Sequence, residues 1–360
     1  MKQNFYNGSG PEADLTISES TSLDQMRQLL VVIPALSWAL LFIGTVGITG
    51  NILTVLIYVK LGFAETINIS YVALAVSDLC CILSSMVAGF CFSPAMQALL
   101  RHFRFQVDLA KFTNFTGYWP QFAFSRTTAF LTAWISLERC LCVLFPTRVR
   151  LIITRKVTKI VITAIFVIGC CPVVLAYVGM ETGWSFNPST NTTILLIFYS
   201  FEGDDNIFQG TAIILYGAVY SLLSWIMVTT CTIFLIIKLR EGARWRKANA
   251  PVFSEGNRGF QNNQRNDNWR ENRITRTVVM IACVFIVCSF PISINSLVSL
   301  AIREKYSLYG SLRSLHMVMG AISLLLGQIN SSSNIVFYTI TGAKFRSTLK
   351  QLFMKTYYRR

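Results

Sequence analysis

Long apolar runs recur along the chain and are separated by short polar segments. Seven of them are long enough to cross a bilayer, which takes about 20 mostly apolar residues in a helix. They cover 30–59, 69–97, 113–144, 158–180, 209–237, 275–301 and 315–341. Hydrocarbon offers the backbone no hydrogen-bond partner, and the alternating pattern of a membrane barrel does not occur in the sequence. We therefore predict an all-α membrane protein, a seven-transmembrane helix bundle with a short amphipathic helix after span seven.

Basic residues in the connections predict the orientation of this bundle. Most Lys and Arg residues fall in the first, third and fifth connections and in the C-terminal segment, and such segments stay in the cytosol. In the plasma membrane we expect an extracellular tail over 1–29, the bundle over 30–341, and a cytosolic amphipathic helix and tail over 342–360. The segment at about 238–274 is rich in Asn, Arg, Gln and Gly and is expected to be a mobile third inner loop.

Composition supports a membrane protein and bears on its partners. Hydrophobic residues make up 53% of the chain and charged residues 14%, whereas soluble domains carry about 25% charged residues. The formal net charge of +15 raises the question of nucleic acid. The basic residues, however, lie where anionic lipids of the inner leaflet attract them. Membrane lipids are therefore expected partners, and nucleic acid is not.

The positions of the cysteines and of the glycosylation sequons limit what the predicted outer face of the protein can carry. None of the ten cysteines lies in the N-terminal tail or in the outer loop 181–208, so a disulfide-built ligand-binding ectodomain is not expected. Sequons at Asn7 and Asn191 fall on the predicted outer face, where glycosylation is possible. The sequence has no His/Cys metal spacing and no nucleophile motif. We do not expect an enzyme.

Asp78 stands in the middle of span two, and a buried ionisable group in a membrane is a candidate for function. Other polar residues lie at similar depth in spans one, three and seven, namely Asn51, Thr128, Asn330, Ser331 and Asn334. Together they form an oxygen-rich set that suits a hard cation such as sodium. The alternative is a hydrogen-bonded cluster that packs the helices without an ion. No other cofactor is expected.

Glu138 and Arg139 close span three next to a basic loop. Adjacent opposite charges at a helix end can anchor the helix at the membrane surface. Their position also suits a surface that changes its contacts with a cytosolic partner.

These motifs together resemble those of the rhodopsin-like (class A) G-protein-coupled receptors. The resemblance runs from Gly50-Asn51 to the stretch after span seven. It rests on Asn51, on Leu-Ala-x-x-Asp ending at Asp78, on Glu138-Arg139-Cys140, on Phe285, Cys288 and Pro291, on Asn334-Ile335-Val336-Phe337-Tyr338, and on Phe345-Arg346. The Ser-Leu-Glu-Arg-Cys-Leu-Cys-Val run and the Asn-Ser-Ser-Ser-Asn segment are similar to those of invertebrate chemosensory-type and peptide-type receptors.

The resemblance implies that an extracellular ligand drives nucleotide exchange on a heterotrimeric G protein. Arg139 is then expected to hold Glu138 and Glu271 in the inactive state and to be released toward Tyr338. The alternative role for Glu271 is only to balance the positive charge of the basic loop in which it lies. The polar set around Asp78 would be the sodium site of the family, and Asn334 would serve both sites.

The chain also departs from the family pattern. Asn114 stands where the family has the span-three cysteine of its outer disulfide, and the second outer loop has no cysteine. Ser289 replaces the usual Trp of span six, and Ile335 replaces the Pro of span seven. How the second outer loop is held is therefore open.

Amine ligands and retinal are not expected, because the residues that would bind them are missing from the sequence. Gln121 stands eighteen residues before Arg139, where receptors for biogenic amines carry an Asp, so an amine ligand is not expected. Span seven has no Lys for a retinal Schiff base.

Arg126 is the sharpest positive signal for a ligand, because a cation buried in a bundle needs a partner. Asp78 is not the expected partner, since Arg126 lies about 200° around the helix from Thr128. We predict that Arg126 binds an anionic group of the ligand or chloride; the alternative is a structural arginine bonded to water and carbonyl groups.

Family positions complete a predicted ligand pocket. It comprises Gln121, Phe122, Ser125, Arg126, Ser289, Ser293 and Gln328, with a hydrogen bond expected between the two glutamines. Glu202, Asp204 and Asp205 in the outer loop would instead attract a basic peptide. The predicted function is a receptor for an extracellular peptide or a small chemosensory ligand. The alternative is a seven-helix transporter or channel, whose usual internal repeats are not visible in the sequence.

Overall fold

The computed structural model describes residues 11–103, 106–107, 109–145, 148–187, 192–199, 207–248, 258–302, 304–307 and 310–357. For some of these, including 11–30 and 258–272, it describes the backbone alone.

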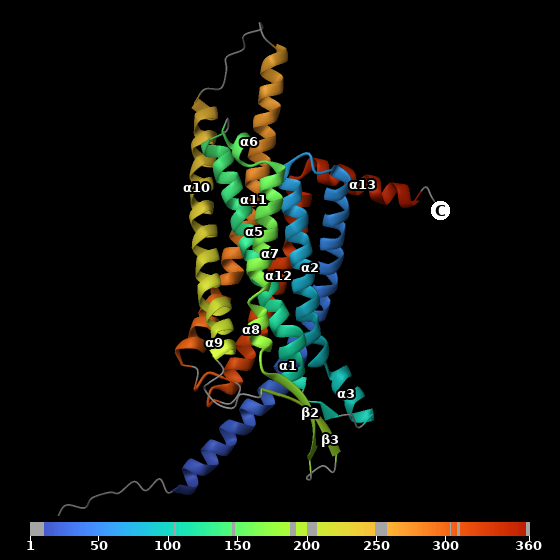
Figure 1. Cartoon of the computed structure of the whole chain (residues 1–360), viewed down its shortest axis with the longest axis vertical. Coiled ribbons are helices and arrows are strands. Elements are labelled where there is room, and N and C mark those ends of the chain that lie inside the picture. The colour runs from blue at the N-terminus through green and yellow to red at the C-terminus, as the bar shows by residue number, and fades with distance from the viewer. Residues whose placement is uncertain are drawn as a thin grey trace, which may run out of the picture.

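Seven helical segments run side by side through the described residues and form a bundle (Figure 1). Four are single helices, α1 (Pro11–Leu61), α2 (Thr66–Cys91), α11 (Arg258–Ala301) and α12 (Arg313–Thr341). The others are composite: α4 (Leu109–Thr113), η1 (Asn114–Tyr118) and α5 (Trp119–Leu144); α7 (Arg155–Cys170) and α8 (Val173–Tyr177); α9 (Ile207–Ile214), η2 (Leu215–Val219) and α10 (Tyr220–Ala248). A short helix, α6 (Val149–Ile152), precedes α7. The predicted seven-helix bundle is confirmed.

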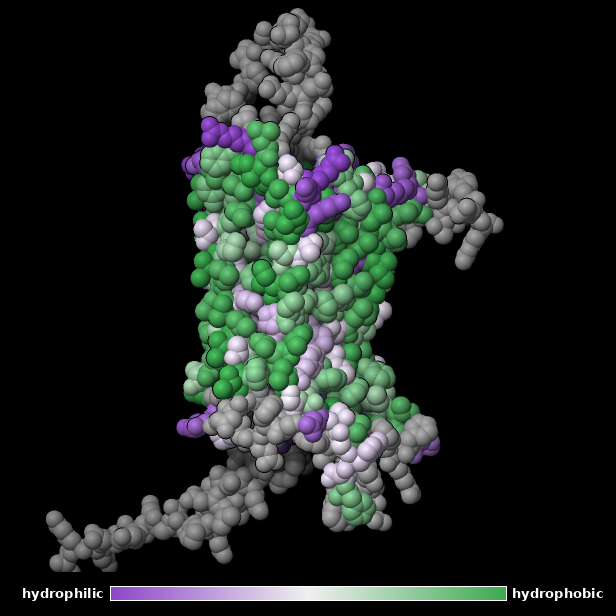
Figure 2. Space-filling view, viewed as in Figure 1, coloured by the Kyte–Doolittle hydropathy of each residue, from purple (hydrophilic) through white to green (hydrophobic). Residues whose placement is uncertain are grey.

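Six of these segments are apolar and long enough, by length and composition, to cross a membrane. The seventh, α12, has the polar run 330–334 on top of Gln328, and this run lowers its hydropathy. Large apolar side chains cover the outside of the bundle; Phe42, Ile160 and Val287 are all more than half exposed. Figure 2 shows this apolar surface between hydrophilic residues at the two ends. A lipid environment accounts for such a surface, because water would penalise it.

Prolines explain where the predicted spans and the observed helices differ. The predicted fourth span is broken after Cys170, because Pro172 has no N–H for the helix ladder. The predicted second span ran to 97, but α2 ends at Cys91 and a separate helix, α3 (Pro94–Phe103), follows. Ser93 starts α3 by accepting a hydrogen bond from the Met96 N–H at 3.2 Å. Wider π turns precede both α5, next to Pro120, and α10.

A small sheet covers one end of the bundle, here called the hairpin end. Strands β2 (Met180–Asn187) and β3 (Thr192–Tyr199) pair antiparallel, and β1 (Gln106–Val107) pairs parallel with β3. No cysteine forms a disulfide. The pairing of β1 with β3 therefore ties the hairpin between α8 and α9 to the segment before α4. The Tyr177 hydroxyl adds a bond of 2.9 Å to the Phe115 carbonyl.

The opposite end of the bundle carries α13 (Ala343–Tyr357), which runs sideways from the bundle (Figure 1); we call it the α13 end. Arg346 fixes the turn into α13 by donating to the carbonyls of Thr339 and Ile340 at 2.9 and 2.7 Å. These are carbonyls that the last turn of α12 would otherwise leave without partners.

The connection predicted as a mobile loop at 238–274 is partly helical. α10 continues to Ala248 and α11 begins at Arg258; residues 249–257 lie outside the described residues. Charged residues end a hydropathy run without ending a helix, because they are good helix formers in water. For the same reason α1 begins at Pro11, within the predicted tail.

Candidate functional site

Asp78 is fully buried in the centre of the bundle. Its Oδ1 accepts a hydrogen bond from Thr128 at 3.0 Å, and its Oδ2 accepts one from the Asn334 amide at 2.7 Å. The carboxylate thereby joins α2, α5 and α12. Both donors are neutral, so the hydrogen bonds leave the negative charge without a compensating cation.

Two more of the predicted sodium-site residues lie around this carboxylate. The Asn51 amide donates to the Ser331 carbonyl at 3.0 Å and connects α1 with α12. The Ser331 side chain lies against Asp78. Asn330 is further out: it lines the cavity described next. The structure thus brings the six predicted residues into one region.

A monovalent cation fits the chemistry of this region. An uncompensated, fully buried carboxylate carries a large desolvation cost, and the groups around it offer the oxygen ligands that hard cations prefer. When bound, sodium would be held by Asp78 and by neighbouring hydroxyl and carbonyl oxygens, and it would supply the missing positive charge.

A small cavity of about 20 Å³ lies beside the Asp78 cluster. Its polar lining comes from Ser125, Arg126, Thr128, Ser289, Asn330 and Ser331, and its apolar lining includes Phe285, Cys288 and Ile292. Arg126 and Thr128 leave α5 about 200° apart around the helix axis, and both line this cavity. Asp78 does not form an ion pair with Arg126: no residue in the described part of the chain forms a salt bridge or a hydrogen bond with that guanidinium, and its Nε is buried without a partner.

Three of the predicted pocket residues, Phe122, Ser293 and Gln328, have partners elsewhere. Ser293 shares a hydrogen bond of 2.7 Å with Ser221, and Phe122 packs on Trp119. The expected bond between Gln121 and Gln328 is wrong. Gln328 instead donates to the Leu40 carbonyl at 2.8 Å, and the side-chain oxygens of both glutamines have no partner.

At the α13 end, Glu138 and Arg139 form a buried ion pair of 3.0 Å. The Glu138 carboxylate is fully buried and also accepts hydrogen bonds from Thr66 at 2.6 Å and Ser70 at 3.3 Å. The Nε of Arg139 has no partner. The arrangement holds Arg139 against α2 and leaves its buried Nε–H free to donate.

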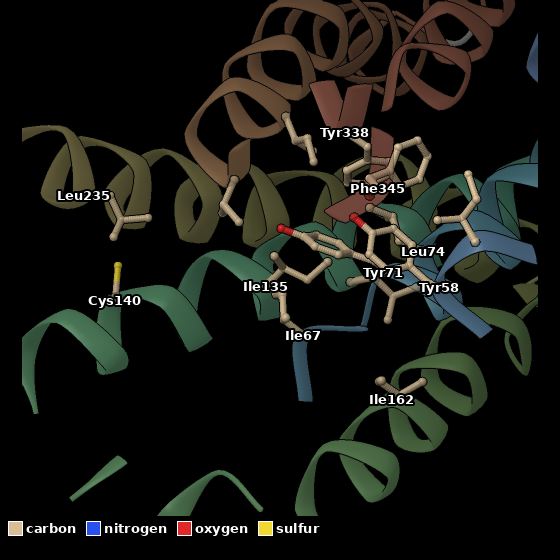
Figure 3. Packing of buried hydrophobic residues seen from close by; sticks show 14 residues of the cluster. Tyr58, Ile67, Tyr71, Leu74, Ile135, Cys140, Ile162, Leu235, Tyr338 and Phe345 are labelled. Carbon is tan, nitrogen blue, oxygen red and sulfur yellow. The ribbon is translucent and has the colours of Figure 1, made fainter. Parts of the chain in front are cut away.

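Next to this pair, four aromatic rings come together from α1, α2, α12 and α13. Tyr58, Tyr71, Tyr338 and Phe345 pack with ring centroids 4.8 to 5.7 Å apart (Figure 3). The hydroxyls of Tyr71 and Tyr338 are buried without partners. A cavity of about 340 Å³ adjoins these rings and is lined also by Arg273 and Lys344.

Several predicted site residues lie outside what the structure describes. This holds for Asn7 and Asn191, and for the acidic residues Glu202, Asp204 and Asp205. Glu271 lies in α11, but its side chain is not among those described. Its predicted contact with Arg139 stays a prediction.

Sequence reasoning missed contacts that hydropathy does not reveal. Thr66 and Ser70 lie four residues apart on α2 and so share one helix face, a spacing that is visible once Glu138 is known to pack there. Thr277 of α11 and Thr341 of α12 share a buried hydrogen bond. That contact joins two consecutive helices through residues 64 positions apart, and no local pattern marks it.

Comparison with known families gives one match, to the model of the 7 transmembrane receptor (rhodopsin family), over residues 50–338. Comparison with curated proteins gives no match. The matched segment covers most of the chain and runs from the last part of α1 into α12, so the chain belongs to the rhodopsin family of seven-transmembrane receptors. It is a multi-pass membrane receptor of the kind that binds extracellular ligands and signals through G proteins.

Proposed function

We propose that this receptor is activated by an extracellular peptide or small chemosensory molecule that enters from the hairpin end. The α13 end then faces the cytosol, as the distribution of Lys and Arg predicts. One polar group of the ligand reaches the space between α5, α11 and α12, where Ser125, Arg126 and Ser289 line a common small cavity.

The buried Glu138–Arg139 pair carries this proposal. It is a charged pair held by three hydrogen bonds and lies beside partnerless tyrosine hydroxyls. Such a group has two arrangements available: Arg139 on Glu138, or Arg139 turned toward Tyr338 and a cytosolic partner. A ligand that favours the second arrangement shifts the population toward it.

The cavity at the α13 end is the binding site that we assign to the cytosolic G protein. Arg273 adds positive charge to its lining, whereas Lys344 pairs with Glu65 at 3.6 Å, and the surface is part apolar because of the tyrosine cluster. An acidic and apolar segment of a G protein suits that lining. The sodium ion proposed at Asp78 would stabilise the arrangement seen here, by compensating the carboxylate that joins α2, α5 and α12.

The test is nucleotide exchange in cells that express the chain with a panel of G proteins, screened against anionic small molecules and basic peptides. A response to either pool that is lost in Arg139→Ala supports the proposal and identifies the ligand class. A response that survives in Arg139→Ala at equal surface expression rules out the role given to Arg139.

A further inference from the structure

Arg126 is a buried cation that has no partner among the residues that the structure describes. Its side chain is 3% exposed, and its Nε has no hydrogen-bond acceptor. The two buried carboxylates of the bundle among the described residues, Asp78 and Glu138, are outside ion-pair distance of it. A guanidinium has five donors and stays charged, so a buried one without an acceptor carries a cost that the folded bundle does not offset.

The cavity at Arg126 has the chemistry of an anion site. Ser125 and Ser289 contribute hydroxyls and Asn330 an amide, and no acidic side chain lines it among the described residues. Phe285 and Ile292 shield the charge from water. Its volume of about 20 Å³ is enough for one water molecule or a small ion. Water would satisfy some donors but leave the positive charge uncompensated.

We propose that this cavity binds a small monovalent anion, held by the Arg126 guanidinium with help from Ser125, Ser289 and Asn330. Two anions fit this description: a chloride ion, and a carboxylate group on the activating ligand. The carboxylate source rests on the ligand pocket proposed above, whereas the chloride source does not. The anion restores electroneutrality next to the Asp78 cluster, because Thr128 and Ser331 line the same cavity.

The experiment measures the melting temperature of the purified full chain in lipid nanodiscs without any G protein. The ten free cysteines, several of them buried, suit a thiol-reactive dye as the probe of unfolding. The sodium concentration is kept constant while chloride replaces gluconate, an anion that is too large for the cavity. A second series replaces gluconate with formate, acetate or propionate. Because no nucleotide exchange is measured, the result is independent of whether the proposed G-protein function holds.

Saturating anion should raise the Tm of the wild type by about 5 °C, the size expected for a ligand at a hundred times its Kd. Arg126→Gln should abolish the shift and Arg126→Lys should keep part of it. Ser289→Leu, which fills the cavity but keeps the arginine, should also abolish it. Arg273→Gln, an exposed arginine at the α13 end, should leave it unchanged. A shift with chloride alone identifies an ion site, and a shift with carboxylates that compete with chloride identifies a ligand subsite.

Two results would overturn the proposal. One is a Tm that is equal in gluconate, chloride and every carboxylate. The other is an anion shift of the same size in the wild type, Arg126→Gln and Ser289→Leu, which would place the anion elsewhere. If Arg126→Gln also lowers Tm and Asp78→Asn restores it without any anion dependence, Arg126 is a distant counter-charge of Asp78 and the proposal is wrong.

Discussion

Replacing Glu138 with Gln tests the switch assigned to the α13 end. The substitution keeps the shape of the side chain but removes its charge. Arg139 then loses a charge-assisted hydrogen bond of 3.0 Å, and Thr66 loses a charged acceptor at 2.6 Å. Hydrogen bonds to charged groups contribute about 1.5–3 kcal/mol and neutral ones about 0.5–1.5. The difference weakens the observed arrangement by about 1–2 kcal/mol.

A change of that size shifts the equilibrium about 5- to 30-fold, since each 1.4 kcal/mol is about tenfold. We expect Glu138→Gln to raise the ligand-free rate of nucleotide exchange by a similar factor, until the released form dominates. The assay is binding of a non-hydrolysable GTP analogue to purified G protein, with equal amounts of receptor in nanodiscs.

Glu241→Gln is the matched control. Its carboxylate pairs with Lys238 at 2.8 Å, but both side chains are exposed, and exposed pairs contribute little. The basal rate should stay at the wild-type value. An unchanged rate in Glu138→Gln, with a normal Tm and a G protein that the wild type does activate, refutes the reasoning.

Three further predictions concern other parts of the bundle. Thr277→Val removes the hydroxyl that joins α11 to α12 and should raise basal exchange about 2- to 10-fold, as expected for a neutral hydrogen bond, in the same assay. Gly169→Ala should lower the Tm by about 1–4 °C, because its Cβ would meet the hydroxyl of Thr127; Gly242→Ala, with open space around it, should not lower it. Replacing sodium with a large organic cation at constant chloride should lower the Tm of the wild type, and Asp78→Asn should make the Tm independent of that exchange.

The sequence predicts the bundle well because each span must satisfy a physical condition by itself. Twenty apolar residues cross a bilayer whatever their neighbours are, so hydropathy finds the helices. The same holds for Asp78: a charge in the middle of an apolar run stands out, and the polar residues at its depth are the ones that surround it in the structure.

Contacts that depend on how the helices rotate against one another were harder to predict. Packing of small residues sets that rotation, and hydropathy does not report it. Gln328 therefore bonds the carbonyl of Leu40 on α1 rather than Gln121. The sheet at the hairpin end was not predicted from the sequence. Its strand β1 pairs with β3, which lies far along the chain, and no disulfide marks that contact.

The central claim is that the α13 end of this receptor catalyses nucleotide exchange through Arg139. The most direct measurement is the exchange rate of purified G proteins of each class with the wild type, Glu138→Gln and Arg139→Ala in nanodiscs. The account predicts that at least one class of G protein exchanges nucleotide faster with the wild type than with empty nanodiscs. The rate should be higher still with Glu138→Gln, and with Arg139→Ala it should equal the rate with empty nanodiscs. No acceleration by the wild type or Glu138→Gln with any class, together with solute flux across vesicles that contain the chain, would contradict it and favour a transporter.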